Sequence, residues 1–139
     1  MADALQSILK IGASGLEAQS TRMRILSENI ANAQSTGNTP GADPYTRKSI
    51  TFQSQLEDAE NLAGVRVASI DNVNSPFRLE HMPGHPAADE KGYVKMPNVD
   101  VMTEVADMRE ANRSYEANLQ VIKQARDMIT MTIDMLRSS

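Results

Sequence analysis

Cysteine and tryptophan are absent from this sequence, and three tyrosines and two phenylalanines are its only aromatic residues. Without cysteine, disulfide bonds and thiol chemistry are excluded, and a zinc site would need histidine and carboxylate ligands alone. Because aromatic side chains are so few and nine methionines are present, the core suits helix-on-helix packing better than a compact β-sandwich.

The sequence also lacks a net positive charge and long apolar runs. The chain has 14 basic and 18 acidic residues, a formal net charge of −4, so nucleic acid is not an expected partner. No stretch approaches the roughly 20 apolar residues that span a bilayer, so direct membrane insertion is not expected. The first residues lack the basic region and apolar stretch of a secretory signal, so we expect any export to occur without a cleaved signal peptide.

No motif indicates catalysis, a cofactor or a metal. The only histidines, His81 and His85, lie in a turn rich in proline and glycine, and two histidines are too few ligands for a metal site. The acidic cluster at Glu57–Glu60 is more typical of a solvated surface than of an acid–base pair. We therefore expect no enzymatic activity and no cofactor.

The N-terminal segment, residues 1–34, is predicted to be a long helix, because it contains no proline and its apolar residues recur at alternating intervals of three and four. Such a seam indicates a helix that lies along another helix. Two glycines either weaken the helix by about 1 kcal/mol each or permit close approach of a neighbouring backbone; they are Gly12 and Gly15. The seam consists of Leu5, Leu9, Gly12, Leu16, Gln19, Met23, Leu26 and Ile30.

The C-terminal segment, residues 98–139, is predicted to be a second long helix that begins after Pro97 and is capped by Asn98 or Asp100. Its seam consists of Val101, Val105, Met108, Asn112, Tyr115, Leu119, Ile122, Arg126, Ile129, Ile133 and Leu136. An additional methionine strip widens the apolar surface, so the helix is expected to meet several neighbours; the strip comprises Met102, Met128, Met131 and Met135.

Two polar residues, Asn112 and Arg126, interrupt the second seam. They are either tolerated where the seam turns outward or set register with another subunit, as isolated polar residues do in coiled coils. Asn29 and Asn32 stand where the first seam stops, and asparagine favours helix ends. They are expected to tie the helix end to the following loop, and their amides could also bind the backbone of a neighbouring chain.

The middle segment, residues 35–97, is dense in turn-forming residues and is predicted to be a small, irregular β-containing element. Candidate strands cover residues 45–52, 65–70, 77–82 and 93–96. The predicted fold is therefore mainly α, with long N- and C-terminal helices packed as an antiparallel coiled-coil-like pair around this middle segment. We expect one structural unit.

Several motifs carry a resemblance to a known family. Ser27–Asn32 followed by Ser35–Gly37 resembles the N-terminal signature shared by flagellar rod and hook proteins. Further matches to proximal rod subunits, in the same order along almost the whole chain, are Pro44–Lys48, Pro83–Asp89 with Gly92–Val94, Pro97–Val101, Glu104–Asp107 and Ser114–Asn118.

This resemblance implies a structural subunit of the bacterial flagellar basal body. Both terminal helices would lie in the inner layer of a tubular rod, which spans the periplasm and transmits motor torque to the hook. The expected partners are copies of the same chain, rod proteins of the FlgB, FlgF, FlgG and FliE families, and the flagellar type III export apparatus during secretion. The short middle segment fits a proximal rod subunit.

The residues expected at the assembly interface belong to the two seams and to the asparagine-rich helix end. They are Leu9, Leu16, Met23, Leu26, Asn29, Ile30, Asn32, Val101, Val105, Met108, Asn112, Tyr115, Leu119, Ile122, Arg126, Ile129, Ile133 and Leu136. Two alternative functions stay open at this point: a different axial subunit, or a soluble coiled-coil adaptor or export chaperone.

Overall fold

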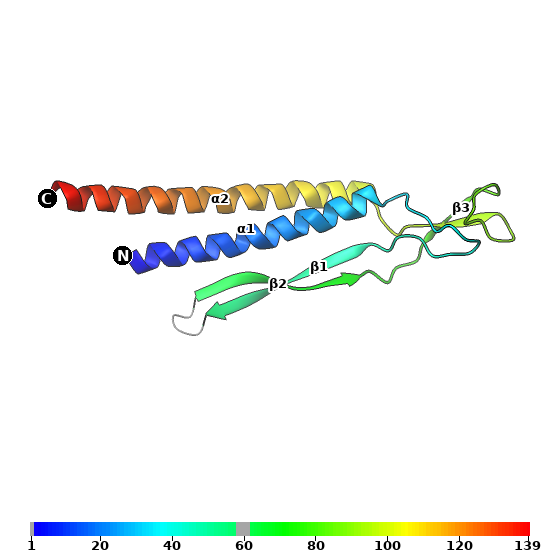
Figure 1. Cartoon of the computed structure of the whole chain (residues 1–139), viewed down its shortest axis with the longest axis horizontal. Coiled ribbons are helices and arrows are strands. Elements are labelled where there is room, and N and C mark those ends of the chain that lie inside the picture. Colours follow the sequence, from blue (N-terminus) through cyan, green and yellow to red (C-terminus); the bar gives the residue numbers. More distant parts are fainter. Residues whose placement is uncertain (1, 58–61) are drawn as a thin grey trace. The chain divides into compact units, whose positions relative to one another are not determined.

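The computed structural model describes residues 2–57 and 62–139 and contains two long helices and two two-stranded sheets (Figure 1). The prediction of a mainly helical fold with a small β-containing middle is confirmed. The elements are α1 (Ala2–Ala31), β1 (Lys48–Glu57), β2 (Leu62–Asn72), β3 (Arg78–His81), β4 (Tyr93–Met96) and α2 (Val101–Ser138).

These elements form two compact units, and each helix contributes to both. The first unit comprises the described parts of Met1–Met23, Thr51–Ser69 and Glu110–Ser139. The second comprises Arg24–Ile50 and Ile70–Arg109. That the chain forms one structural unit stays a prediction.

In the first unit, α1 and α2 pack side by side in opposite directions. A Cβ built on Gly12 would lie 2.7 Å from Ile122 Cγ1, and one built on Gly15 would lie 2.7 Å from Asn118 Nδ2. Further along α1, Arg22 Nη2 lies 3.5 Å from an oxygen of Glu110. Because the facing residues fall in number along α2 as they rise along α1, the predicted antiparallel pair is confirmed. The two glycines leave room for the side chains of Ile122 and Asn118, so this face of α1 accommodates a close neighbour.

The row of α2 that faces α1 contains small and polar residues. Ala111 and Ala125 are buried, and Asn118 between them is half-buried against Gly15. The spacing of seven residues keeps these three positions on one side of the helix. Ile122 also belongs to this contact, because it faces Gly12. The inner row of α2, defined as Ala111, Asn118 and Ala125, therefore permits a short distance between the helices.

The sheet of β1 and β2 adds a third layer to the first unit, where α1 runs between α2 and this sheet (Figure 1). The backbone N–H of Val65 in β2 donates to Ser14 Oγ of α1 at 3.1 Å. Ala18, one turn further along α1, is buried. Helix α1 is therefore covered on two sides within this unit.

The second unit has its own small core, built from Ala87, Val94 and Met96. Strands β3 and β4 pair antiparallel, with Arg78 opposite Met96 and His81 opposite Tyr93. The strands predicted over residues 65–70, 77–82 and 93–96 are thus confirmed. The strand predicted over residues 45–52 begins only at Lys48, because the residues before Lys48 make side-chain contacts with the helices instead.

Helix α2 begins in the second unit with a side-chain cap. Asp100 Oδ1 accepts a hydrogen bond from the Met102 N–H at 3.1 Å, and the Asp100 carbonyl accepts from the Glu104 N–H at 3.0 Å. This is the geometry of an N-cap residue. Of the two caps that the sequence predicts, Asp100 has this role and Asn98 has another.

Candidate functional site

A cluster of polar groups, with Asn29 and Glu104 buried at its centre, joins the end of α1, the start of β1 and the first turn of α2 within the second unit. Its members, which we name the polar junction, are Asn29, Tyr45, Arg47, Lys48 and Glu104. The elements bring these residues together although they lie up to 75 positions apart in the chain.

Asn29 stands at the centre of the polar junction and is completely buried. Its Nδ2 donates to the Lys48 carbonyl at 2.8 Å and to Glu104 Oε2 at 3.2 Å. Its Oδ1 accepts from the Tyr45 hydroxyl at 2.7 Å and from the Lys48 N–H at 3.0 Å. An asparagine amide offers two donors and two acceptor sites, so Asn29 uses its whole capacity inside its own chain.

Glu104 provides the charge of the junction. Its side chain is completely buried, and Oε1 accepts a hydrogen bond from Arg47 Nε. A carboxylate without such a partner would be costly to bury, since both water and a counter-charge would be missing. Among the described residues, no buried side-chain nitrogen or oxygen lacks a hydrogen-bond partner. Each buried polar atom of the junction therefore has a hydrogen-bond partner, and the Glu104 carboxylate has a counter-charge.

Tyr45, in the loop between α1 and β1, contributes its hydroxyl to the junction. Burial raises the pKa of the Tyr45 phenol, and the negative charges of Glu28 and Glu104 raise it further. The hydroxyl therefore keeps its proton under ordinary conditions and acts as the donor to Asn29.

Asn98 fastens the loop before α2 to the strands. Its Oδ1 accepts from the Arg47 N–H at 2.8 Å. Its Nδ2 donates to the Val73 carbonyl at 3.0 Å and to Ser75 Oγ at 2.9 Å. Asn98 thereby positions the backbone of a residue whose side chain belongs to the polar junction.

Asn32 ends α1. Its Nδ2 donates to the Glu28 carbonyl at 2.9 Å, and its Oδ1 accepts from Ser35 Oγ at 3.0 Å. The expectation that Asn29 and Asn32 tie the helix end to the following loop is confirmed.

The apolar seam that the sequence highlights on α2 divides into two rows. Met108, Tyr115, Ile122 and Ile129 are half-buried. The other row, which we name the outer row, directly follows the inner row in sequence and consists of Asn112, Leu119, Arg126 and Ile133. All four residues are exposed, Leu119 to 47% and Ile133 to 46%.

The remaining residues expected at an interface differ between the two helices. On α1, Leu26 is buried and the others are half-buried; these are Leu9, Leu16, Met23 and Ile30. On α2, Val101, Val105 and Leu136 are exposed. Among these seam residues, those of α1 are thus more buried than those of α2. Outside the seam, α1 also exposes Ile8 and Ile11, to 39% and 37%.

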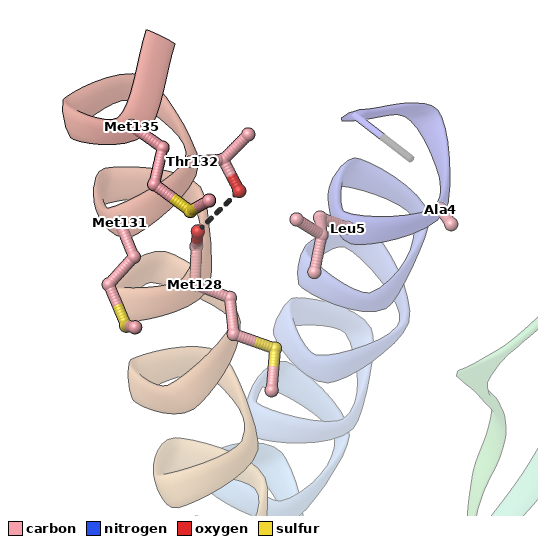
Figure 2. Close-up of a pocket in the computed structure, with 6 residues that line it drawn as sticks. All are labelled: Ala4, Leu5, Met128, Met131, Thr132 and Met135. Carbon is pink, nitrogen blue, oxygen red and sulfur yellow. Dashed lines mark hydrogen bonds between the residues drawn. The ribbon is translucent and has the colours of Figure 1, made fainter. Parts of the chain in front are cut away.

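The apolar surface of α2 includes a hollow near the start of α1 (Figure 2). The hollow has a volume of about 310 Å³ and is lined by Ala4, Leu5, Met128, Met131, Thr132 and Met135. The single hydroxyl in the lining, that of Thr132, donates to the Met128 carbonyl at 2.9 Å (Figure 2). The hollow is therefore suited to an apolar side chain.

The other residues considered from the sequence have structural partners or fall outside the structure. The ring of His81 packs edge-on against Tyr93, with centroids 5.0 Å apart. His85 hydrogen-bonds to the backbone and to Thr36. Of the acidic cluster, Asp58, Ala59 and Glu60 lie outside the described residues. Within residues 2–57 and 62–139, no group of three metal-ligating side chains and no helix able to span a membrane is found.

Comparisons with known proteins identify the family. Residues 9–42 match the family "Flagella basal body rod protein", and residues 90–135 match "Flagellar basal body rod FlgEFG protein C-terminal". The chain is 58% identical over 137 residues to the flagellar basal-body rod protein FlgC of Agrobacterium fabrum, covering 99% of each. It is 42% identical over 131 residues to FlgC of Salmonella typhimurium, covering 94% of this chain and 96% of the relative.

The chain belongs to the FlgC family of flagellar basal-body rod proteins. A more distant member, FlgC of Borreliella burgdorferi, is 37% identical and aligns with 96% of this chain. The family resemblance inferred from the sequence is therefore confirmed. The hydrogen bond between Asn29 and Glu104 joins the two segments that match the family models.

Sequence reasoning missed most partners of Asn29. In the sequence, Tyr45, Arg47 and Lys48 stand out only as part of a family motif, and no local pattern pairs them with Glu104. One signal was present: Glu104 stands seven residues before Ala111, in a heptad row that is otherwise small or neutral. A charged residue in such a row indicates a buried ion pair.

Proposed function

We propose that this structural rod subunit joins the flagellar rod through the outer row and the apolar hollow of α2. The observation that carries the proposal is the exposure of large apolar side chains on α2 beside a helix contact that is already complete within the chain. Contiguous exposed apolar surface on a soluble protein marks an interaction site. Burying it would contribute about 1.5–3 kcal/mol for each fully buried large side chain.

The outer row is suited to helix-on-helix packing with a neighbouring subunit. Its members recur at intervals of seven, so a second helix can follow them along α2. Asn112 and Arg126 alternate with Leu119 and Ile133, and such polar residues fix the register of a helix contact. The sharper of the two sequence interpretations, that these polar residues set register with another subunit, is the one adopted in this proposal.

The polar junction has an indirect role in this proposal. Because Asn29 and Glu104 have their partners inside the chain, they have little capacity for hydrogen bonds to a neighbour. They hold the first turn of α2 against the end of α1 within the second unit. A shaft that carries torque requires such fixed, densely packed helices.

The proposed setting is the proximal rod in the periplasm, where the chain transmits torque from the motor to the hook. The partners in this proposal are further copies of the chain and rod proteins of the FlgB, FlgF, FlgG and FliE families. Secretion would proceed through the flagellar export apparatus without a cleaved signal peptide. No catalytic step is part of the proposed function.

Thiol protection tests the proposal, because the native chain contains no cysteine. Leu119→Cys is expected to react with a maleimide in the free subunit and to be protected in purified basal bodies. Ala125→Cys is the matched control, since Ala125 is buried in the inner row and is expected to be protected in both states. A Leu119→Cys thiol that reacts equally fast in free subunits and in basal bodies would contradict the proposal.

A further inference from the structure

Three of the six residues that line the apolar hollow are methionines. Met128, Met131 and Met135 recur at intervals of three and four residues, which places them on one face of α2. We name these three residues the methionine triad. Figure 2 shows the Met128 side chain extending from α2 toward α1 and the Leu5 side chain extending from α1 toward α2. The triad therefore supplies the apolar wall that α2 contributes to the hollow.

The triad side chains are open to solvent in the free subunit. Met128, Met131 and Met135 are exposed to 55%, 64% and 71%. In contrast, Met96 belongs to the core of the second unit and is 3% exposed. A thioether must meet an oxidant directly, so its susceptibility to oxidation follows its exposure. The triad is thus far more accessible than Met96 to an oxidant in solution.

A hydroperoxide converts an accessible thioether into a sulfoxide. A lone pair of the sulfur attacks one oxygen of hydrogen peroxide, the O–O bond breaks, and an S–O bond forms. The sulfur gives two electrons to the peroxide, and the proton on the transferred oxygen passes to the departing hydroxide, which leaves as water. The product is a polar, chiral side chain whose oxygen accepts hydrogen bonds.

The hollow offers no free side-chain donor to such an oxygen. Of the six lining residues, only Thr132 has a hydroxyl, and that hydroxyl donates to the Met128 carbonyl at 2.9 Å. An apolar side chain that enters the hollow brings no donor either. A sulfoxide covered by this side chain would lose its hydrogen bonds to water without replacement, which is unfavourable. In the free subunit the same oxygen stays in water, so the fold of the subunit is little affected.

We propose that the methionine triad is an oxidation site through which a hydroperoxide blocks incorporation of the subunit into the rod. The inference rests on the proposed function, in which a neighbouring subunit covers the hollow. Oxidation of the triad changes the surface used for assembly, whereas the buried contacts of the second unit stay intact. The free subunit is the sensitive form, because a triad that is already covered in the rod is protected.

Peptide mass spectrometry of the purified free subunit, sampled during treatment with hydrogen peroxide, measures the chemical step. Oxidation of the triad is expected to be at least about tenfold faster than oxidation of Met96. Circular dichroism of the subunit with a fully oxidised triad is expected to show unchanged helix content. If Met96 oxidises as fast as the triad, or if helix content falls as the triad is oxidised, selective modification of the hollow is overturned.

A leucine variant tests the effect of oxidation on assembly in a strain that lacks the native chain. Replacing all three triad residues, Met128→Leu, Met131→Leu and Met135→Leu, keeps the hollow apolar but removes its thioethers. Synthesis of the subunit is started under sublethal hydrogen peroxide, and newly formed basal bodies are counted. The leucine variant is expected to form severalfold more basal bodies than wild type under peroxide and an equal number without it. Equal sensitivity of the two strains to peroxide would overturn the proposal.

Met102→Leu is the matched control for this experiment. Met102 is 79% exposed but lies at the start of α2, outside the hollow. Its removal is therefore expected to leave assembly as sensitive to peroxide as in wild type. Resistance of the Met102→Leu strain equal to that of the leucine variant would place the sensitive site outside the triad.

A glutamine variant separates failure of this inference from failure of the proposed function. Glutamine is polar like methionine sulfoxide and favours helices about as well as methionine. With Met128→Gln, Met131→Gln and Met135→Gln combined, the free subunit is expected to keep its helix content but to form few basal bodies. If this variant assembles normally, the hollow is not covered by a neighbour and the proposed function loses that contact. If it fails to assemble while wild type and the leucine variant are equally sensitive to peroxide, only the oxidation site is overturned.

Discussion

The two units of this rod subunit differ in whether contacts within the chain satisfy their polar groups and cover their apolar side chains. In the second unit, every hydrogen-bonding position of Asn29 is occupied, Glu104 has a counter-charge, and a core of Ala87, Val94 and Met96 is closed. In the first unit, the contact of α1 with α2 is tight, but α2 also exposes large apolar residues.

This difference indicates which contacts serve folding and which are available for assembly. Directional polar contacts hold one unit in a single geometry, since each of its buried side-chain polar atoms, among the described residues, has a partner. Non-directional apolar surface in the other unit can be buried only by another chain. The following predictions test that division, from the largest expected effect on the free subunit to the smallest.

Removing the buried carboxylate should have the largest effect. Glu104→Ala leaves Arg47 and an Asn29 N–H without their partner, so the free energy of unfolding should fall by about 3–5 kcal/mol. Urea denaturation of the free subunit measures the loss. Glu110→Ala is the matched control, because Glu110 forms an exposed ion pair with Arg22 in the first unit and should cost less than about 1 kcal/mol. Equal losses would contradict the difference between the units.

Substitutions in the close contact between α1 and α2 should change the stability by an intermediate amount. In Gly12→Ala, the added Cβ meets Ile122 Cγ1 at 2.7 Å, and overpacking outweighs the gain in helix propensity by about 1 kcal/mol. Gly15→Ala should be nearly neutral, because it meets the end of the Asn118 side chain, which can rotate. Thermal denaturation of both variants, and of Gly12→Ala combined with Ile122→Ala, measures the effect. The penalty should shrink in the Ile122→Ala background, and an unchanged penalty would place the steric conflict elsewhere.

Tyr45 predicts a smaller, pH-dependent effect. Tyr45→Phe removes one donor to Asn29 and should cost about 1 kcal/mol at neutral pH. Because the folded-state pKa of Tyr45 is raised, the stabilisation is complete below the unfolded pKa of about 10 and is lost as the pH rises through the folded pKa. Urea denaturation of wild type and Tyr45→Phe at increasing alkaline pH should show the difference between them shrinking. If the difference in unfolding free energy between wild type and Tyr45→Phe grows with pH, the raised pKa of Tyr45 is contradicted.

Much of the fold follows from local patterns in the sequence. The absence of proline and the seam from Leu5 to Ile30 place α1, since its predicted and observed ends differ by one residue at the start and three at the end. Turn residues around β3 and β4 define those strands, and Asp100 is one of two predicted caps. These features depend on neighbours in the chain, so the sequence is sufficient for them.

The face of α2 that contacts α1 could not be predicted from local sequence patterns. Periodicity selects the large apolar residues, such as Leu119, whereas a close helix contact requires small ones, such as Ala111 and Ala125. The polar junction was likewise hidden, because Asn29 and Glu104 lie 75 residues apart. Asn29 was recognisable as an unusual residue near a helix end, but its partners depend on the tertiary structure.

The most direct test of the division between folding and assembly is to compare Leu119→Asp with Ile122→Asp. Leu119 is 47% exposed in the outer row, so Leu119→Asp should change the unfolding free energy of the free subunit by no more than about 0.5 kcal/mol. In a strain that lacks the native chain, the same variant should fail to support rod assembly and motility. Ile122→Asp, which faces Gly12, should reduce both stability and assembly. Normal motility of the Leu119→Asp strain would contradict the account.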